Sequence, residues 1–199
     1  VWEMLAFVKL RMVGGEASIG LNVENETRRL IHERAAALPH NELLDETLRV
    51  RLALENQRVR TRGGDIDIKY GAGGMLDVYF AMRFLQLRDD VPDEDVEGNR
   101  RKEGEANGRS TTYMLARLAA KGSLSGENYS ELLAGYNFLS DLDHDLRLTI
   151  GRTTRVPLGN ENALRMIATR MGLASPADLL EQLTLHRLAI RAAFENILS

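Results

Sequence analysis

Apolar residues recur at helical spacing along most of the 199-residue chain, and only four prolines interrupt it, so the pattern predicts a largely helical protein. Glycine follows several of the expected helices, as it commonly does where a helix ends. The expected helices are Trp2–Val13, Asn22–Ala37, Asn41–Arg60, Met75–Leu87, one capped by Ser110, Thr111 or Thr112 and ending at Lys121, Ser125–Ile150, one marked by Leu164, Ile167, Ala168 and Met171, and one opening at Ser175-Pro176.

One segment departs from the helical pattern. The alternation over Asp65–Lys69 favours a short strand, which leads into the glycines of 71–74. The expected fold class is therefore all-α, a helical bundle with one short extended segment before a Gly-rich turn. We expect N-terminal helices and the Gly-rich segment over 1–88, a flexible charged loop over 89–107 and a C-terminal helical bundle over 108–199.

Polar residues fall within the apolar stripes of two helices in the expected C-terminal bundle. Asp143 lies in the stripe that runs from Leu132 to Ile150, where an unpaired carboxylate is costly. We therefore expect Asp143 to anchor the bundle by pairing with an arginine. His186 lies in the stripe of the last helix, formed by Leu179, Leu183, His186, Ile190, Phe194 and Ile197.

Charge and cysteine content exclude several classes of function. The chain has no cysteine, which excludes disulfides, a thiolate metal site and a cysteine nucleophile. The net charge of −3 comes from mixed acidic and basic residues, so the sequence predicts no strongly positive surface for nucleic acid. Residues Val1–Arg11 resemble neither a signal peptide nor a spanning helix. We expect a cytoplasmic protein with no nucleic-acid or membrane partner.

The glycine-rich turn is the first candidate site. Gly73 and Gly74 precede a helix, where backbone N–H groups can approach a phosphate closely. Asp77 falls in the first turn of that helix, where it would face a metal ion or complement the helix dipole. Since most such turns only reverse the chain, the sequence alone favours a structural turn.

Carboxylates form the second candidate site. Asp65 and Asp67 alternate on the expected strand, and such a pair can hold Mg²⁺ for nucleotidyl transfer. The Gly-Ser turn that accompanies this pair in polymerase-type enzymes is missing upstream, so we expect edge-strand or turn aspartates. Asp141, Asp143 and Asp145 cannot converge on one ion, because Asp143 points away from the other two on a helix. The histidines show no metal-ligand spacing.

Several segments together resemble the bacterial glutamine synthetase adenylyltransferase family, in the helical region that follows a nucleotidyltransferase domain and is shared with PII-uridylyltransferases. Trp2-Glu3, Ala6, Lys9 and Arg11 look like the family's W-E-x-x-A-x-x-K/R-x-R helix. The segment KYGAGGMLDVYF over 69–80 is similar to the signature K-x-G-P-G-G-I-R-D-I-E-F. Further matches are Gln86-Leu87, Leu142-Asp143-His144 with Leu146 and Leu148, Thr153, Pro157, and His186-Arg187 with Phe194.

The resemblance implies which residues lie beside the nucleotide site of the preceding domain: Lys69, Gly71, Gly73, Gly74 and Asp77. It implies no catalytic or metal-binding residue in this chain, because the family's metal-holding carboxylates lie upstream. Ala72, Leu76 and Tyr79 depart from the signature proline, arginine and glutamate, so two charged groups are absent. Leucine offers neither the charge nor the donors with which arginine binds phosphate.

For the parent protein the resemblance implies Mg²⁺-dependent transfer of AMP from ATP to a tyrosine of glutamine synthetase, and its reversal, under control by PII. Expected partners are the catalytic domain, glutamine synthetase and PII, with ATP and Mg²⁺ as parent cofactors and none expected in this chain alone. Two alternatives stay open: a fragment of a PII-uridylyltransferase, and a helical interaction module without nucleotide binding. A closed turn buried by neighbouring side chains would mark the second.

Overall fold

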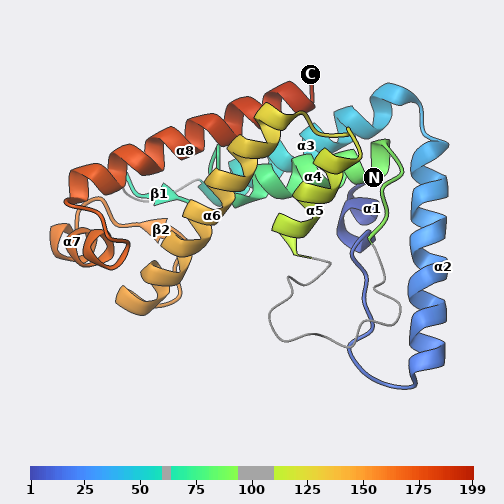
Figure 1. Ribbon diagram of the computed structural model, residues 1–199, viewed down its shortest axis with the longest axis horizontal. Helices are drawn as coiled ribbons and strands as arrows, with labels where there is room; N and C mark the ends of the chain where they lie inside the picture. Colours follow the sequence, from blue (N-terminus) through green and yellow to red (C-terminus); the bar gives the residue numbers. More distant parts are fainter. Residues whose placement is uncertain (60–63, 94–109) are drawn as a thin grey trace. The chain divides into compact units, whose positions relative to one another are not determined.

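The computed structural model describes residues 1–59, 64–93 and 110–199 and confirms the all-α fold class (Figure 1). Within these ranges, no helix combines the length and apolar character that a bilayer crossing requires. The elements are α1 (Trp2–Phe7), α2 (Ala17–Ala36), α3 (His40–Val59), β1 (Ile66–Asp67), α4 (Met75–Arg88), α5 (Thr111–Ala120), α6 (Gly126–Thr149), β2 (Arg155–Val156), α7 (Glu161–Arg170) and α8 (Pro176–Ile197).

The chain forms two compact units that interleave along the sequence. Unit 1 combines residues 1–50 and 80–126, and unit 2 combines residues 51–79 and 127–199. Helices α3 and α4 are each divided between the units, with one end in unit 1 and the other end in unit 2. The expected division into 1–88, 89–107 and 108–199 follows chain order and stays a prediction. Most of the expected loop lies outside the described residues.

Within unit 1, α1 packs against α2. The helix expected over Trp2–Val13 ends at Phe7, and α2 begins at Ala17 instead of near Asn22, so both boundaries were wrong. The segment between α1 and α2 is not helical, because it is held against α2: the backbone N–H of Met12 donates to the buried Glu24 carboxylate at 3.0 Å. Gly20 lets this segment approach, since a Cβ there would overlap the Met12 side chain.

The described beginning of the expected charged loop packs into unit 1. Val91 and Asp93 are buried, and the buried Gln86 amide donates to the Val91 carbonyl at 3.1 Å and to Asp93 at 2.9 Å. The sequence pattern did not reveal this packing, because the partner side chain comes from α4 and not from the loop itself.

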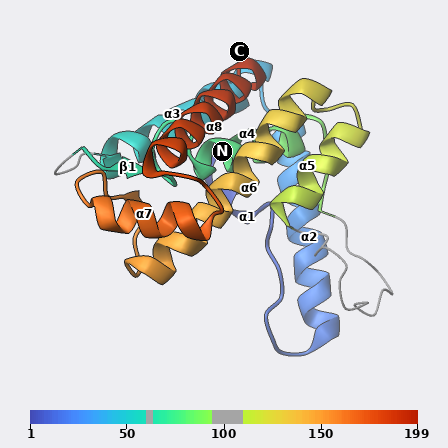
Figure 2. The same cartoon turned by 60° about the vertical axis from the view of Figure 1, so that its left-hand side comes forward.

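Unit 2 is built around α6, α7 and α8, and in both Figure 1 and Figure 2 the gold α6 runs beside the red α8. The close approach of α6 and α8 depends on Gly135, where an added Cβ would lie 2.5 Å from Ile190. Helix α7 packs on α8. The apolar stripe expected along the last helix is buried as predicted, with His186 half-buried within it.

A two-stranded antiparallel sheet joins distant parts of unit 2. Ile66 pairs with Val156 and Asp67 with Arg155. The strand expected within Asp65–Lys69 is confirmed in a shorter form. Its partner β2 was missed, because the polar stretch before Pro157 shows no strand-like alternation.

Candidate functional site

The glycine turn of unit 2 is closed by its own backbone hydrogen bonds. Gly74 N–H donates to the Gly71 carbonyl at 3.0 Å, Met75 N–H to the Ile68 carbonyl at 2.9 Å and Leu76 N–H to the Lys69 carbonyl at 3.1 Å. These are the N–H groups that a helix N-terminus would otherwise offer to an anion. The start of α4 is therefore capped from within the chain.

Asp77 locks this turn from inside. Its side chain is fully buried, one oxygen accepts from Gly73 N–H at 2.7 Å, and the other accepts from Arg51 Nε at 2.5 Å. Arg51 is also fully buried and donates to the Gly71 carbonyl at 2.9 Å. The ion pair therefore holds both ends of the turn, and removing one partner would leave a charge buried without compensation.

Two arginines of α8 complete the network. Arg187 donates from Nη2 at 2.8 Å and from Nε at 3.1 Å to the Ala72 carbonyl. Burial lowers the pKa of Arg187, against smaller opposing effects of Asp77 and other carboxylates. Arg191 Nη1 lies 3.4 Å from an oxygen of Asp77 and 3.4 Å from one of Glu55. The turn is thus braced by α3 on one side and by α8 on the other.

Gly73 shows why the turn needs glycine. Its φ is +68°, in the left-handed region that favours glycine, and an added Cβ would overlap the backbone of Arg187. Gly71 is similarly restricted, because a Cβ there would lie 2.5 Å from the Asp67 carbonyl oxygen. Gly73 therefore permits close packing of the turn on α8, and Gly71 permits its close approach to β1.

The five residues expected beside a nucleotide site are brought together by this turn, but in different roles. Gly71, Gly73, Gly74 and Asp77 are buried and engaged within the chain, whereas Lys69 is half-buried with its Nζ 5.5 Å from the Tyr70 ring centroid. Their adjacency to a nucleotide stays a prediction. Chemically, the turn is a closed structural joint and not an open phosphate cradle.

The three departures from the family signature lie on the accessible side of the same turn. Ala72, Leu76 and Tyr79 are all half-buried, whereas Asp77 and Val78 between them are fully buried. Leu76 and Tyr79 are three residues apart within α4 and share one face of it, whereas Ala72 lies in the turn before that helix. The substitutions therefore change the surface beside the turn and leave its buried lock intact.

The aspartates of the expected strand have structural partners, as the sequence suggested. Asp67 accepts from the N–H groups of Lys69 at 2.9 Å and Tyr70 at 2.8 Å, and its other oxygen accepts from Thr154 Oγ1 at 3.2 Å. Asp65 accepts from Leu158 N–H at 3.2 Å. Each carboxylate organises its own loop, and the described residues hold no cluster of three or more acidic or histidine side chains suited to a metal ion.

The expected pairing of Asp143 with an arginine is confirmed, but the partner lies on the same helix, so this pair does not link two elements. Asp143 pairs with Arg147 one turn along α6, at 2.8 Å. Asp145 is the carboxylate that links two elements, because it is buried and accepts from Arg170 Nε of α7 at 2.7 Å. Asp143 is only half-buried on α6, so the exposed Arg147 of the same helix can reach its carboxylate.

His186, the polar member of the α8 stripe, packs as an aromatic residue. Its ring stacks on Phe138 of α6 with centroids 4.6 Å apart. Burial lowers the pKa of His186, which favours the neutral ring. This histidine therefore contributes to packing between α6 and α8.

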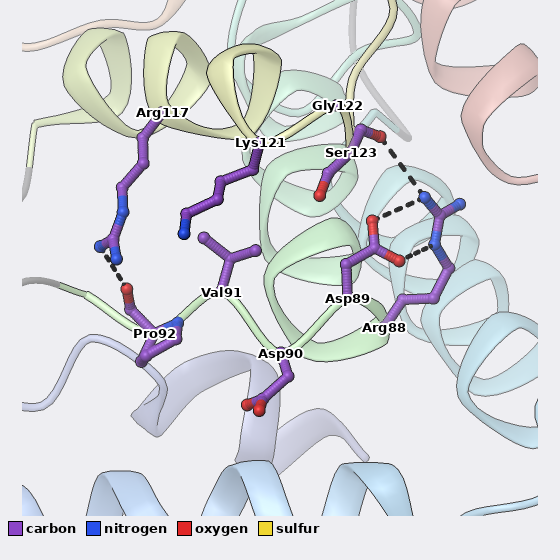
Figure 3. A pocket seen from close by; sticks show the side chains of 9 residues that line it. All are labelled: Arg88, Asp89, Asp90, Val91, Pro92, Arg117, Lys121, Gly122 and Ser123. Atoms are coloured by element: carbon purple, nitrogen blue, oxygen red, sulfur yellow. Dashed lines mark hydrogen bonds and ion pairs between the residues drawn. The ribbon is translucent and has the colours of Figure 1, made fainter.

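Unit 1 contains a separate pocket, shown in Figure 3. Two of its cations have partners nearby: Arg88 donates to Asp89 at 2.7 and 2.8 Å, and Arg117 donates to the Pro92 carbonyl at 2.5 Å. Three basic and two acidic side chains line the pocket. Its lining residues are Arg88, Asp89, Asp90, Val91, Pro92, Arg117, Lys121, Gly122 and Ser123.

The sequence reasoning missed Arg51 and Arg191 as partners of the turn. The spacing pointed elsewhere, because Arg51 and Arg191 each have a glutamate four residues further along the same helix, Glu55 and Glu195. Because an unpaired buried carboxylate is costly, Asp77 needs a charged partner just as Asp143 was expected to. Sequence spacing alone, however, does not tell which arginine reaches it.

A helical bundle carrying a braced glycine turn defines the class of this protein as a helical module. The family model described as GlnD PII-uridylyltransferase matches residues 46–198. The chain belongs to this family. The resemblance to glutamine synthetase adenylyltransferases, expected from the glycine-turn segment and its flanking helices, is confirmed by the curated relatives.

Those relatives are all bifunctional glutamine synthetase adenylyltransferase/adenylyl-removing enzymes. The proteins of Pseudomonas syringae pv. tomato and Pseudomonas aeruginosa are each 29% identical over 198 residues, covering 100% of this chain and 19% of the relative. That of Mycobacterium leprae is 32% identical over 169 residues, covering 84% of this chain and 15% of the relative. The chain thus spans less than a fifth of the length of these relatives.

Proposed function

We propose that this chain is the helical, non-catalytic module of a glutamine synthetase adenylyltransferase-like protein. In this proposal Lys69, Gly71, Gly73, Gly74 and Asp77 place the turn beside the nucleotide site of an attached nucleotidyltransferase domain. That domain would use ATP and Mg²⁺ to transfer AMP to glutamine synthetase in the cytoplasm, and PII would control it. The module would supply rigidity and a docking face.

The closed turn is the observation that carries the non-catalytic part of this proposal, and the adenylyltransferase relatives carry the rest. A residue that reacts or holds Mg²⁺ must present free oxygens to the substrate, whereas Asp77 and Asp67 direct their oxygens to arginine, hydroxyl and backbone N–H groups of the same chain. The relatives add that a segment of this length forms a minor part of a bifunctional enzyme. Both observations favour a supporting role.

A transfer assay tests the absence of catalysis. The purified chain, incubated with ATP, Mg²⁺ and glutamine synthetase, is expected to incorporate no AMP, while the Pseudomonas syringae enzyme under the same conditions serves as the positive control. Incorporation by this chain alone would show that it carries a complete catalytic site and would overturn the proposal.

A hybrid enzyme tests the supporting role directly. The matched segment of the Pseudomonas syringae enzyme is replaced by this chain, once unchanged and once with Ala72→Pro, Leu76→Arg and Tyr79→Glu. We expect the second hybrid to transfer AMP, because it regains the charged groups beside the turn. Two hybrids that fold, as judged by circular dichroism, but transfer nothing would contradict the module role.

A helical interaction module without nucleotide contact is the second candidate. The closed, buried turn is the mark expected of such a module, so it fits this candidate as well as the first, and this candidate requires no nucleotide site nearby. Folded but inactive hybrids, together with retained binding of the isolated chain to glutamine synthetase or PII, would favour this candidate. A fragment of a PII-uridylyltransferase is the third candidate: the matching family model carries that description, whereas the relatives named above are adenylyltransferases.

A further inference from the structure

A pocket of unit 2, at the end of α6, is lined almost entirely by cationic and hydroxyl side chains. It shares no lining residue with the glycine turn or with the pocket of Figure 3. Its lining residues are Arg147, Arg152, Thr153, Thr154 and Arg155.

The arginines of this pocket differ in how far their charge is compensated. Arg147 pairs with Asp143 at 2.8 Å. Arg155 donates to the Arg58 carbonyl at 3.0 Å, and its Nε lies 3.8 Å from an oxygen of Asp67. Arg152 is exposed, and no acceptor or carboxylate partner for its guanidinium is found among the described residues. The pocket therefore has more positive than negative charge.

Two hydrogen bonds within the pocket prepare its donors for an anion. The backbone N–H of Arg155 donates to Thr153 Oγ1 at 3.0 Å, so the hydroxyl proton of Thr153 is available to a further acceptor. The bond from Arg155 to the Arg58 carbonyl fixes one side chain before any ligand arrives. A ligand would thus meet one ordered guanidinium, one uncompensated guanidinium and one hydroxyl donor.

We propose that this pocket binds a phosphate group. Guanidinium groups bind phosphate oxygens with paired, charge-assisted hydrogen bonds, and threonine hydroxyls add single donors. The phosphate would come either as inorganic phosphate or as the terminal phosphate of a nucleotide, since both present the same oxygens. Arg152 is the principal contact, because its charge has no other partner. This site goes beyond the proposed function and does not depend on it.

Calorimetric titration of the complete 199-residue chain tests the site, with inorganic phosphate, ADP without metal, and adenosine as separate titrants at low ionic strength. We expect phosphate or ADP to bind and adenosine to give no heat. Tighter binding of ADP than of phosphate would identify a nucleotide as the source, and equal or weaker binding would identify the free ion. Absence of heat from both phosphate and ADP would overturn the proposal.

Arg152→Ala tests the assignment to this pocket. The variant should weaken binding by about tenfold or more, as expected for loss of a charge-assisted contact. Arg165→Ala is the matched control, because Arg165 is an exposed arginine of α7 that pairs with Glu161 and lies outside the pocket. Equal weakening in both variants would show a general charge effect and no site. Circular dichroism checks that both variants fold.

Discussion

Buried Asp77 shows how one side chain can determine what a loop does. Its two oxygens serve Arg51 and the N–H of Gly73, so the turn is held by charge and by backbone at the same residue. A helix N-terminus of this kind usually offers free N–H groups to anions. Here the chain supplies its own anion, because Asp77 accepts from Gly73 N–H and from Arg51.

Gly73→Ala is expected to destabilise unit 2 strongly. The left-handed conformation alone costs alanine about 1–2 kcal/mol, and overlap with the Arg187 backbone should raise the loss in unfolding free energy to about 3 kcal/mol or more. Gly172→Ala is the control, because Gly172 has a φ of +72° with no atom near its Cβ position. Urea unfolding of both variants measures the difference. Similar losses would show that the turn does not pack against α8 as described.

At the scale of elements, hydrophobic periodicity predicted where most helices lie but not which elements they contact. Helix α4 was expected from Met75 to Leu87 and spans Met75–Arg88, because its apolar residues are dense and a glycine turn precedes it. Helix α1 ended early, since its continuation is held by a side chain of α2. Strand β2 was missed, because two residues carry no pattern and pairing with β1 comes from the fold.

The link between α6 and α7 gives a prediction at this scale. Asp145→Ala should lower the unfolding free energy by about 1–2 kcal/mol, because it removes the buried partner of Arg170. Asp143→Ala should cost only about 0.5 kcal/mol, since it removes a pair within one helix. Thermal or urea unfolding compares the two. A larger loss from Asp143→Ala would restore Asp143 as the anchor.

At the scale of the whole molecule, the sequence predicted the fold class, and its resemblance to a family is confirmed. The candidate site was less predictable: the resemblance located the glycine turn, but the residues that close it come from α3 and α8, which are distant in sequence. Such convergence depends on how helices pack within unit 2. The sequence motif therefore located the glycine turn, and the tertiary contacts showed that the turn is closed by side chains of α3 and α8.

Amide hydrogen exchange at the turn, measured by NMR on the complete chain, tests the central claim most directly. Because the N–H groups of Gly73, Gly74 and Met75 are bonded within the protein, they should exchange slowly, and equally slowly with and without ATP and Mg²⁺. Fast exchange in the free protein that becomes slow on adding ATP and Mg²⁺ would contradict the account, because the turn would then be an open phosphate site that closes on its ligand.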